Sequence, residues 1–557
     1  MKHAYLLAII ASLTTSPFTQ AAMKADTLLT DAIIYGHNQA DTIAINNGKI
    51  MFIGKSSEIK PYMTDKTEVI NLEHAYVMAG FIDNHNHVFE AASEAGGNCE
   101  LSLDATLEEQ IPYLNACREN AQSDDWIMGY GFSLAAILSD EDRYTPLEII
   151  DRIFPKQPVV LMEQTSHSMW VNSAALKKAG ITKTSSEPQG GKILKDDQSG
   201  ELNGILFDNA GDLVMEMAWN SLDNQFSQSY QGLMNGLEEA AKHGITTIGD
   251  GRLYWKRGWY EVWKEAEKNN ELTARVSLRP WIYPTDSMPP QLEFLESVHS
   301  SDKSRLLIVD QVKMYSDGIL INGTAKTLAP YLNTYIPDEP YGINYIPPQK
   351  MKSWLDALDK IGYSAHIHAI GDGAVHESLN AIEHAQKQGS DKAYTLTHAE
   401  LVDSKDIPRF AKLEVTADFQ GGSDYVAQHD HQWAEAFIGA KRADSLMNPR
   451  AIFDTGANVT LSSDWNVHDI NPLVGIANSL KMNKTGLPDI HSAISAYTIN
   501  AARSLGVDDI TGSIELGKSA DLVVLANDIT QLPANEIAET EILMTLLRGN
   551  IVFDSEE

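Results

Sequence analysis

The chain has 557 residues, of which 43% are hydrophobic, so it is long enough to form more than one domain around a large core. Its formal net charge is −33 at pH 7. A surface this acidic repels polyanions, which excludes nucleic acid as an expected partner.

The first residues have the pattern of an export signal. A basic start at residues 1–3 precedes an apolar run at residues 4–13, which is too short to span a bilayer. Small residues suit cleavage after Ala21 or Ala22, so residues 1–22 are predicted to be a signal peptide. We therefore expect an exported, periplasmic protein with no membrane anchor after cleavage. An uncleaved N-terminal anchor is the alternative.

The chain contains two cysteines, Cys99 and Cys117. In an exported protein they could form a disulfide that stabilises the fold. Two small buried thiols are an equally supported interpretation, and the sequence leaves the choice open.

Both ends of the chain carry short apolar runs broken by turn residues, which is typical of strands and hairpins. Turn residues stand at 36–38 and 46–48, and the runs near the other end are KSADLVVLAND and ILMTLLRGNIVFD. Residues 23–79 and 508–557 are too short to bury their own apolar faces separately. We expect them to combine in one β-rich unit.

Between these ends, residues 80–507 alternate strand-like and helix-like segments. The strand candidates are YVMAGFIDNHNH, GITTIGDG, ARVSLRPWIY, IVDQVKMYSDG, YSAHIHAIGD, AYTLTHAEL, LEVTADFQG and NVTLSSD. Eight strands alternating with helices predict an α/β fold of the (β/α)8, or TIM barrel, type. Roughly 150 residues separate the first two strands, far more than a loop needs, so an inserted subdomain is expected at about 100–230.

Residues with metal-binding chemistry stand at the carboxyl ends of these strands, where barrel active sites lie. They are His85, His87, Lys313, His368, His398 and Asp464. Imidazoles and a carboxylate that meet at one rim are typical of a metal site. Residues i and i+2 of a strand share a face, so His85 and His87 can bind one ion together.

Three further histidines fit this pattern less well. His366 shares a strand face with His368 but lies deeper, so a hydrogen-bonded core histidine is favoured over a ligand. His429 and His431 follow the seventh strand in a polar segment, and we expect them at the surface or at the mouth of a substrate pocket.

Several motifs together resemble a known family. GFIDNHNH, VKMYSDG, HAIGD, THAEL and SSDW resemble the successive metal-site motifs of the amidohydrolase superfamily. HSMWVNSAAL, AYTINAARSLG and GSIELGKSADLVVL resemble its YtcJ-like and N-substituted formamide deformylase-like branch. The resemblance spans nearly the whole chain. It implies a distorted metal-bearing barrel and a composite β-sandwich built from both chain ends.

The resemblance also implies roles for the site residues. His85 and His87 would bind one divalent metal together with Asp464, and His368 and His398 would bind a second. Zinc is the expected metal, with one or two ions per chain.

Lys313 resembles the lysine that becomes a carbamate and bridges two metals. A plain ammonium cannot ligate a cation, so Lys313 must be neutral or carboxylated to belong to this site. A buried, unmodified Lys313 beside a single ion is the alternative. Asp464 would also carry the proton, with a helix-capping aspartate as its alternative.

The implied activity is hydrolysis of a non-peptide carbon–nitrogen bond, in an N-acyl or N-formyl compound, by a metal-bound hydroxide. His167 and Asp317 are candidate contacts for this small-molecule substrate, and a structural role is the alternative for His167. Asp208 stands where the family often has glutamate. Two other functions stay open: hydrolysis of a cyclic amide, carbamate or lactone at the same site, and a binding or regulatory role without turnover. A homo-oligomer is also open.

One stretch suggests a different chemistry. GSIELGKS, at 512–519, fits the phosphate-loop pattern G-x-x-x-x-G-K-[ST]. A true phosphate loop follows a buried strand and opens a helix, whereas this stretch follows a helix-like segment and precedes the strand-like ADLVVL. No nucleotide binding is expected, and the resemblance assigns the stretch to a turn of the terminal β-sandwich.

Overall fold

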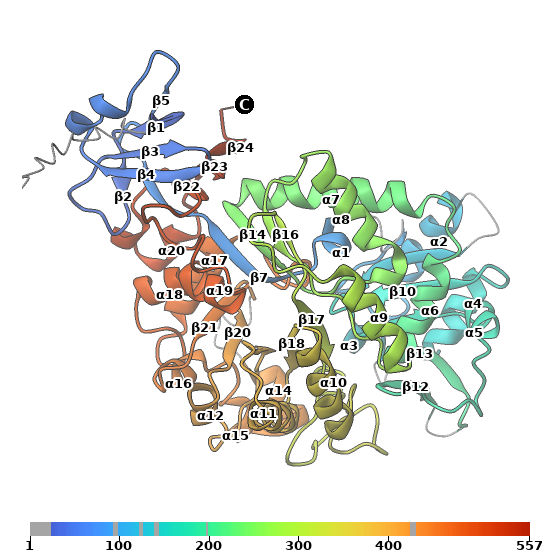
Figure 1. Cartoon of the computed structure of the whole chain (residues 1–557). Coiled ribbons are helices and arrows are strands. Elements are labelled where there is room, and N and C mark those ends of the chain that lie inside the picture. Colours follow the sequence, from blue (N-terminus) through green and yellow to red (C-terminus); the bar gives the residue numbers. More distant parts are fainter. Residues whose placement is uncertain are drawn as a thin grey trace, which may run out of the picture.

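The structure is a computed structural model of the chain (Figure 1) and describes residues 24–92, 99–121, 126–138, 144–196, 199–423 and 431–556. The expected signal peptide and His429 lie outside these described residues. Within them, no helix is long and apolar enough to cross a membrane.

Two parallel sheets build the inner part of the molecule (Figure 1), ordered β16-β15-β14-β7 and β17-β18-β19-β20-β21. The strands are β7 (Phe81–Asn86), β14 (Ile245–Asp250), β15 (Arg275–Ser277), β16 (Leu307–Ile308), β17 (Gln311–Tyr315), β18 (Ser364–Ala369), β19 (Thr395–His398), β20 (Thr416–Gln420) and β21 (Val459–Ser462). Every residue of these strands is buried, as expected for parallel sheets covered on both faces.

The two sheets approach each other at both edges. A parallel bridge joins Trp281 to Lys313 at one edge, and β21 lies against β7 at the other. The ladders of the described residues nevertheless form two separate sheets rather than one closed ring. The fold is therefore an α/β fold with mixed sheets, and a closed barrel stays a prediction.

Helices follow the strands and pack around these sheets (Figure 1). They include α7 (Gln225–Lys242), α8 (Trp259–Lys268), α9 (Met288–Val298), α10 (Pro348–Lys360), α11 (Asp372–Lys387), α12 (Ile407–Lys412), α16 (Pro449–Phe453), α17 (Pro472–Lys481), α18 (Ile490–Ala496) and α19 (Ile499–Ser504). Helix α7 shows why they form: Leu233 and Leu237 are buried on one face, and Gly244 follows with a φ of +72° that ends the helix.

Between β7 and β14 the chain builds a further six-stranded sheet, ordered β12-β13-β11-β10-β9-β8. Its strands are β8 (Cys99–Glu100), β9 (Ile127–Phe132), β10 (Val159–Glu163), β11 (Ser168–Val171), β12 (Gly191–Lys195) and β13 (Leu202–Asp208), and its longer helices are α2 (Ile111–Asn120), α4 (Pro146–Ile153) and α6 (Asn209–Trp219). We call this segment the inserted sheet. A disulfide joins Cys99 to Cys117, the pairing that the sequence left open.

Strands from both chain ends share a sheet, ordered β2-β6-β22-β23-β24, beside a second sheet, β4-β3-β1-β5 (Figure 1). The strands of the shared sheet are β2 (Ile33–Ile34), β6 (Tyr76–Ala79), β22 (Leu522–Leu525), β23 (Ile542–Leu547) and β24 (Asn550–Asp554). The other sheet has β1 (Thr27–Thr30), β3 (Thr42–Asn46), β4 (Lys49–Gly54) and β5 (Glu68–Asn71). Residues 512–519 form turns between α19 and β22 and open no helix.

Candidate metal centre and substrate pocket

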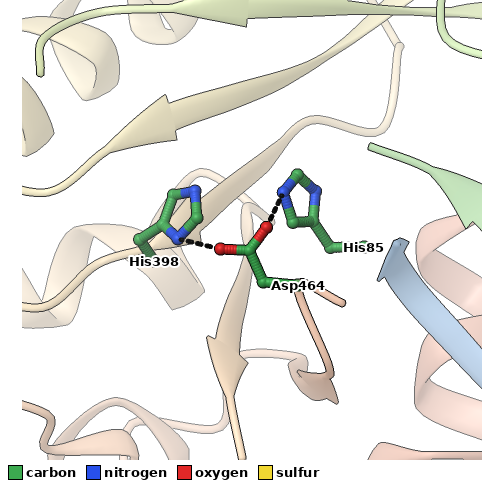
Figure 2. A group of neighbouring side chains, drawn as sticks. All are labelled: His85, His398 and Asp464. Carbon is green, nitrogen blue, oxygen red and sulfur yellow. Dashed lines mark ion pairs between the residues drawn. The ribbon is translucent and has the colours of Figure 1, made fainter. Parts of the chain in front are cut away.

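The strand ends of β7, β19 and β21 bring three predicted ligands together (Figure 2). The Nε2 atom of His85 lies 3.1 Å from Oδ1 of Asp464, and Nδ1 of His398 lies 3.9 Å from Oδ2. One ligand atom from each of these three buried residues falls within 4.8 Å of the others. The Asp464 amide donates to the His85 carbonyl at 2.8 Å, so the backbone itself holds the carboxylate beside β7.

This donor set fits a divalent metal ion. Burial lowers the pKa of His85 well below its usual range and that of His398 to about 3, so both imidazoles are neutral. Burial opposes ionisation of Asp464, but the neighbouring His85 and His87 hold its pKa well below the ordinary value. Neutral imidazole nitrogens and an ionised carboxylate are the ligands that zinc-type ions take.

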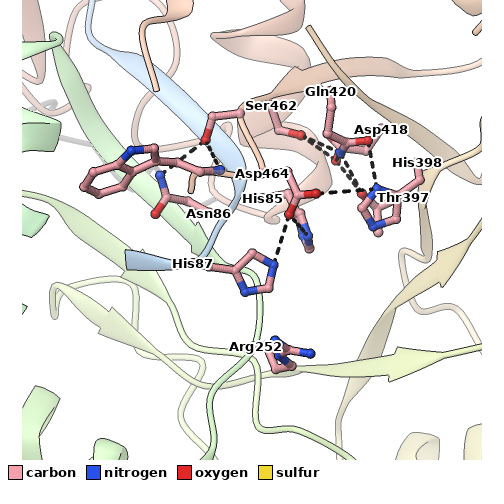
Figure 3. A network of polar contacts seen from close by, with 12 residues as sticks. His85, Asn86, His87, Arg252, Thr397, His398, Asp418, Gln420, Ser462 and Asp464 are labelled. Atoms are coloured by element: carbon pink, nitrogen blue, oxygen red, sulfur yellow. Dashed lines mark hydrogen bonds and ion pairs between the residues drawn. The ribbon is translucent and has the colours of Figure 1, made fainter. Parts of the chain in front are cut away.

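His87 approaches the same carboxylate and is held from behind. Its Nε2 lies 3.0 Å from Oδ1 of Asp464 (Figure 3), and its Nδ1 lies 2.8 Å from Glu90, which accepts from Arg252 at 2.7 Å. Burial lowers the pKa of His87, but the two carboxylates outweigh it and raise the pKa. A metal ion that binds at Nε2 therefore has to displace a proton from this ring. A carboxylate behind a metal-ligating histidine fixes the ring orientation. Our sequence analysis missed Glu90, although it stands three residues after His87.

Lys313 lies within the same cluster. Its side chain is fully buried and its Nζ is 3.2 Å from Nε2 of His85. Burial lowers its pKa well below the ordinary value, which favours the neutral amine. No ion pair between Lys313 and a carboxylate is found among the described residues. Lys313 of β17 and His85 of β7 are thus in contact, although they are 228 residues apart and belong to different sheets.

The two histidines of β18 have different surroundings. His366 is stacked on His85, with its Nε2 3.0 Å from Nδ1 of that ring, so it is a partner of a candidate ligand. His368 lies with its ring centroid 4.4 Å from that of His398, and its Nε2 is 3.0 Å from the carbonyl of Gly318. Its buried Nδ1 has no hydrogen-bond partner among the described residues. Such an unpartnered nitrogen beside His398 fits a further ligand position.

A polar network that includes two residues of β20 supports His398 (Figure 3). Nδ1 of His398 lies 2.9 Å from Oε1 of Gln420, whose amide in turn donates to Ser462 at 3.1 Å. Asp418 accepts from Thr397 and from Ser462, each at 2.8 Å. Because an amide oxygen only accepts hydrogen bonds, Nδ1 of His398 carries the proton and donates to Gln420. Nε2 of His398 then has a lone pair for another partner. Our sequence analysis assigned these β20 residues no role, although residues alternating along TADFQ share the inner face.

A pocket of about 540 Å³ opens beside the cluster, with His368, His398 and Asp464 in its wall. Predicted residue His167 also lines it, together with the apolar side chains Ile319, Leu320, Ile321, Ile370 and Val467. Apolar side chains combined with converging polar and ionisable groups are typical of a small-molecule site.

The remaining candidates lie elsewhere. Asp317 is not among the residues lining the pocket, and its carboxylate accepts from the backbone amides of Lys326, Ile370 and Gly371 at 2.8, 3.1 and 2.9 Å. This geometry gives it a role in holding loops and offers no support for a substrate contact. His431 precedes α14 (Gln432–Ile438) and does not line the pocket either.

Comparison with known proteins defines the class. The fold is shared with the crystal structure of an uncharacterized metal-dependent hydrolase from Pyrococcus furiosus, with a TM-score of 0.67 and 21% identity over 90% of this chain and 99% of that one. Residues 68–553 match the Amidohydrolase family. The chain therefore belongs to the amidohydrolase family, which confirms the relationship inferred from the motifs.

Three relatives match over most of their length. Protein LONG AFTER FAR-RED 3 of Arabidopsis thaliana is 29% identical over 91% of this chain and 88% of its own. YtcJ of Bacillus subtilis is 26% identical over 93% of this chain and 96% of its own. N-substituted formamide deformylase of Arthrobacter pascens is 25% identical over 92% of this chain and 95% of its own.

Proposed function

We propose that this protein is a metal-dependent amidohydrolase that cleaves a non-peptide carbon–nitrogen bond of amide type, in an N-acyl or N-formyl compound. The observation that carries the proposal is the convergence of His85, His398 and Asp464 within 4.8 Å, with His398 and Asp464 in the wall of a pocket of about 540 Å³. The bond type is supported by the similarity to a formamide deformylase along nearly the whole chain.

The site residues have separate roles in metal binding and proton transfer. His85, His87 and Asp464 hold one divalent cation, for which zinc is the expected identity, and His368 and His398 hold a second. Such a cation, when bound, polarises a carbonyl and lowers the pKa of a water. Asp464 takes up a proton and delivers it to the leaving nitrogen, because it is an ionised carboxylate in the pocket wall and lies beside the metal ligands.

Lys313 belongs to this site as an N-carboxylated bridge between the two cations. A neutral, buried amine is the form that can add CO₂, and the low pKa caused by burial supports that form. Addition of CO₂ to the amine, with release of one proton, would give a carbamate and so place a negatively charged group beside His85.

Architecture and location complete the proposal. The two parallel sheets close as a distorted (β/α)8 barrel, with the terminal strands as a β-sandwich. Residues 1–22 direct export to the periplasm and are removed. N-terminal sequencing of periplasmic protein should find a start near Ala22 or Met23, and an intact Met1 there would contradict export by cleavage.

A hydrolysis screen tests the activity. Zinc-loaded protein is offered N-formyl amines, N-acyl amines, cyclic amides, carbamates and lactones. We expect turnover of N-formyl or N-acyl amines that a chelator abolishes and zinc restores. Turnover limited to lactones or cyclic amides would contradict the proposed bond type and support the alternative substrate class. Full metal content without turnover of any compound would indicate a binding protein.

A further inference from the structure

The inserted sheet brings a second histidine–carboxylate pair to the pocket. Nδ1 of His167 lies 2.6 Å from Oδ1 of Asp208, and both side chains are buried. His167 stands immediately before β11 and Asp208 ends β13, two strands that pair antiparallel. The pair therefore comes entirely from the inserted sheet, whereas the candidate metal ligands come from the two parallel sheets.

A backbone hydrogen bond and a neighbouring ring hold the pair in place. The Asp208 amide donates to the His167 carbonyl at 2.8 Å, and the His167 ring is stacked on Tyr315 with centroids 5.5 Å apart. Asp208 has a φ of +50°, a strained conformation for a residue with a side chain. Gly318 leaves the space for its carboxylate, because a Cβ there would lie 2.7 Å from Oδ2.

The chemistry of the pair determines what His167 offers to the pocket. A carboxylate only accepts hydrogen bonds, so the proton of a neutral imidazole stands on Nδ1. Nε2 then carries a lone pair and acts as an acceptor. No described residue makes a hydrogen bond to Nε2, although His167 lines the pocket that also contains His398 and Asp464.

We infer that Nε2 of His167 accepts a hydrogen bond from the N–H of a secondary amide bound in this pocket. The inference rests on the proposed function and narrows its substrate class. N-monosubstituted amides fit, whereas tertiary amides and esters have no N–H to donate. His167 is thus a specificity-determining residue that the inserted sheet contributes, and Asp208 is the residue that positions it.

Binding of three matched compounds tests this inference. N-butylformamide donates an N–H, N-butyl-N-methylformamide replaces it with a methyl group, and butyl formate replaces it with oxygen. Calorimetry in an Asp464→Asn background, where turnover is slowed, gives their dissociation constants. We expect the secondary amide to bind roughly tenfold more tightly than both others, which is the value of one hydrogen bond.

Three variants separate hydrogen bonding from shape. His167→Phe keeps the ring against Tyr315 and should remove the tenfold preference. Asp208→Asn can donate to Nδ1 and move the imidazole proton to Nε2, so the preference should fall there too. His376→Phe is the matched control, because His376 also pairs with an aspartate, Asp406, at 3.0 Å but does not line the pocket.

The outcomes distinguish the inference from the proposed reaction. A preference that persists in His167→Phe, equal affinities for the three compounds, or no binding of any amide would overturn the inference. A preference that depends on His167 in a protein that cleaves no amide would support the inference and refute the proposed reaction.

Discussion

Two histidine–carboxylate groups contribute side chains to the same pocket, and their geometry differs. At the strand ends, His85, His87 and His398 approach the two oxygens of one carboxylate, Asp464. In the inserted sheet, His167 and Asp208 form a single pair at 2.6 Å. Several nitrogens around one carboxylate create a place for a cation, whereas a single pair can only orient one ring. The number of donor atoms that converge, rather than the residue types, separates the two roles.

We call His85, His87, His398 and Asp464 the convergent group. The largest loss of activity is expected from Asp464→Asn, because the three histidines surround this carboxylate. The amide oxygen can still bind a metal but cannot take up a proton, so kcat should fall by about 10² to 10⁴ while much of the metal remains. Steady-state kinetics and elemental analysis of the purified variant measure both quantities. Asp469→Asn, at an exposed position of the same pocket, is the control. A near-normal kcat in Asp464→Asn would remove the proposed proton carrier.

Lys313→Ala tests whether the convergence includes a bridging group. If Lys313 is N-carboxylated, its loss should lower metal content and activity together, with metal affinity reduced by about 100-fold. Added propionate should restore part of both, because a free carboxylate can occupy the vacated position. Lys268→Ala, whose side chain is 72% exposed, should change neither. Full metal content with normal rates in Lys313→Ala would rule out a bridged pair of ions.

The convergent group was largely predictable from the sequence. His85 and His87 follow the period-two rule of a strand, and Asp464 stands where the last predicted strand ends. Parallel strands bring their carboxyl ends to one side, so Lys313 could be placed near His85 despite a separation of 228 residues. The eight strand candidates match β7, β14, β15 and β17 to β21 in order, because each is a short buried run, whereas the two-residue strand β16 was not predicted separately.

The remaining features depend on contacts that a sequence pattern does not encode. Gln420 supports His398 because β20 lies between β19 and β21, an order that exists only in the folded sheet. His368 turns its Nε2 toward the carbonyl of Gly318, a backbone group with no sequence signature. Spacing also could not pair Cys99 with Cys117, because a disulfide requires a short Cα separation, which is 5.1 Å here.

Glu90→Gln tests how much the contact between Glu90 and His87 supports metal binding by the convergent group. The amide keeps the shape of Glu90 but removes the charge that holds His87 and Arg252. We expect metal affinity to fall by about tenfold, at the lower end for residues that hold a ligand, with the fold intact. Competition with a chromogenic chelator measures the affinity. Glu261→Gln, an exposed position on α8, should bind metal normally. Unchanged affinity in Glu90→Gln would mean that Asp464 alone fixes the His87 ring.

The smallest effect concerns Asp250, a third carboxylate, which neither converges with the histidines nor pairs with one. Its Oδ1 accepts from the Arg252 amide at 3.1 Å, and its buried Oδ2 has no hydrogen-bond partner among the described residues. Burial raises its pKa from 3.8 to about 7. Between these two pKa values the folded protein retains a proton that the unfolded chain has released, so the free energy of unfolding falls as the pH rises from about 4 to about 7.

Asp250→Asn cannot ionise, so its melting temperature in chelator should exceed that of the parent by roughly 2 °C at pH 8. The difference should be smaller at pH 5, where part of the window has not yet been crossed. A constant difference in melting temperature across this pH range would show that Asp250 does not titrate there and would contradict a pKa of about 7.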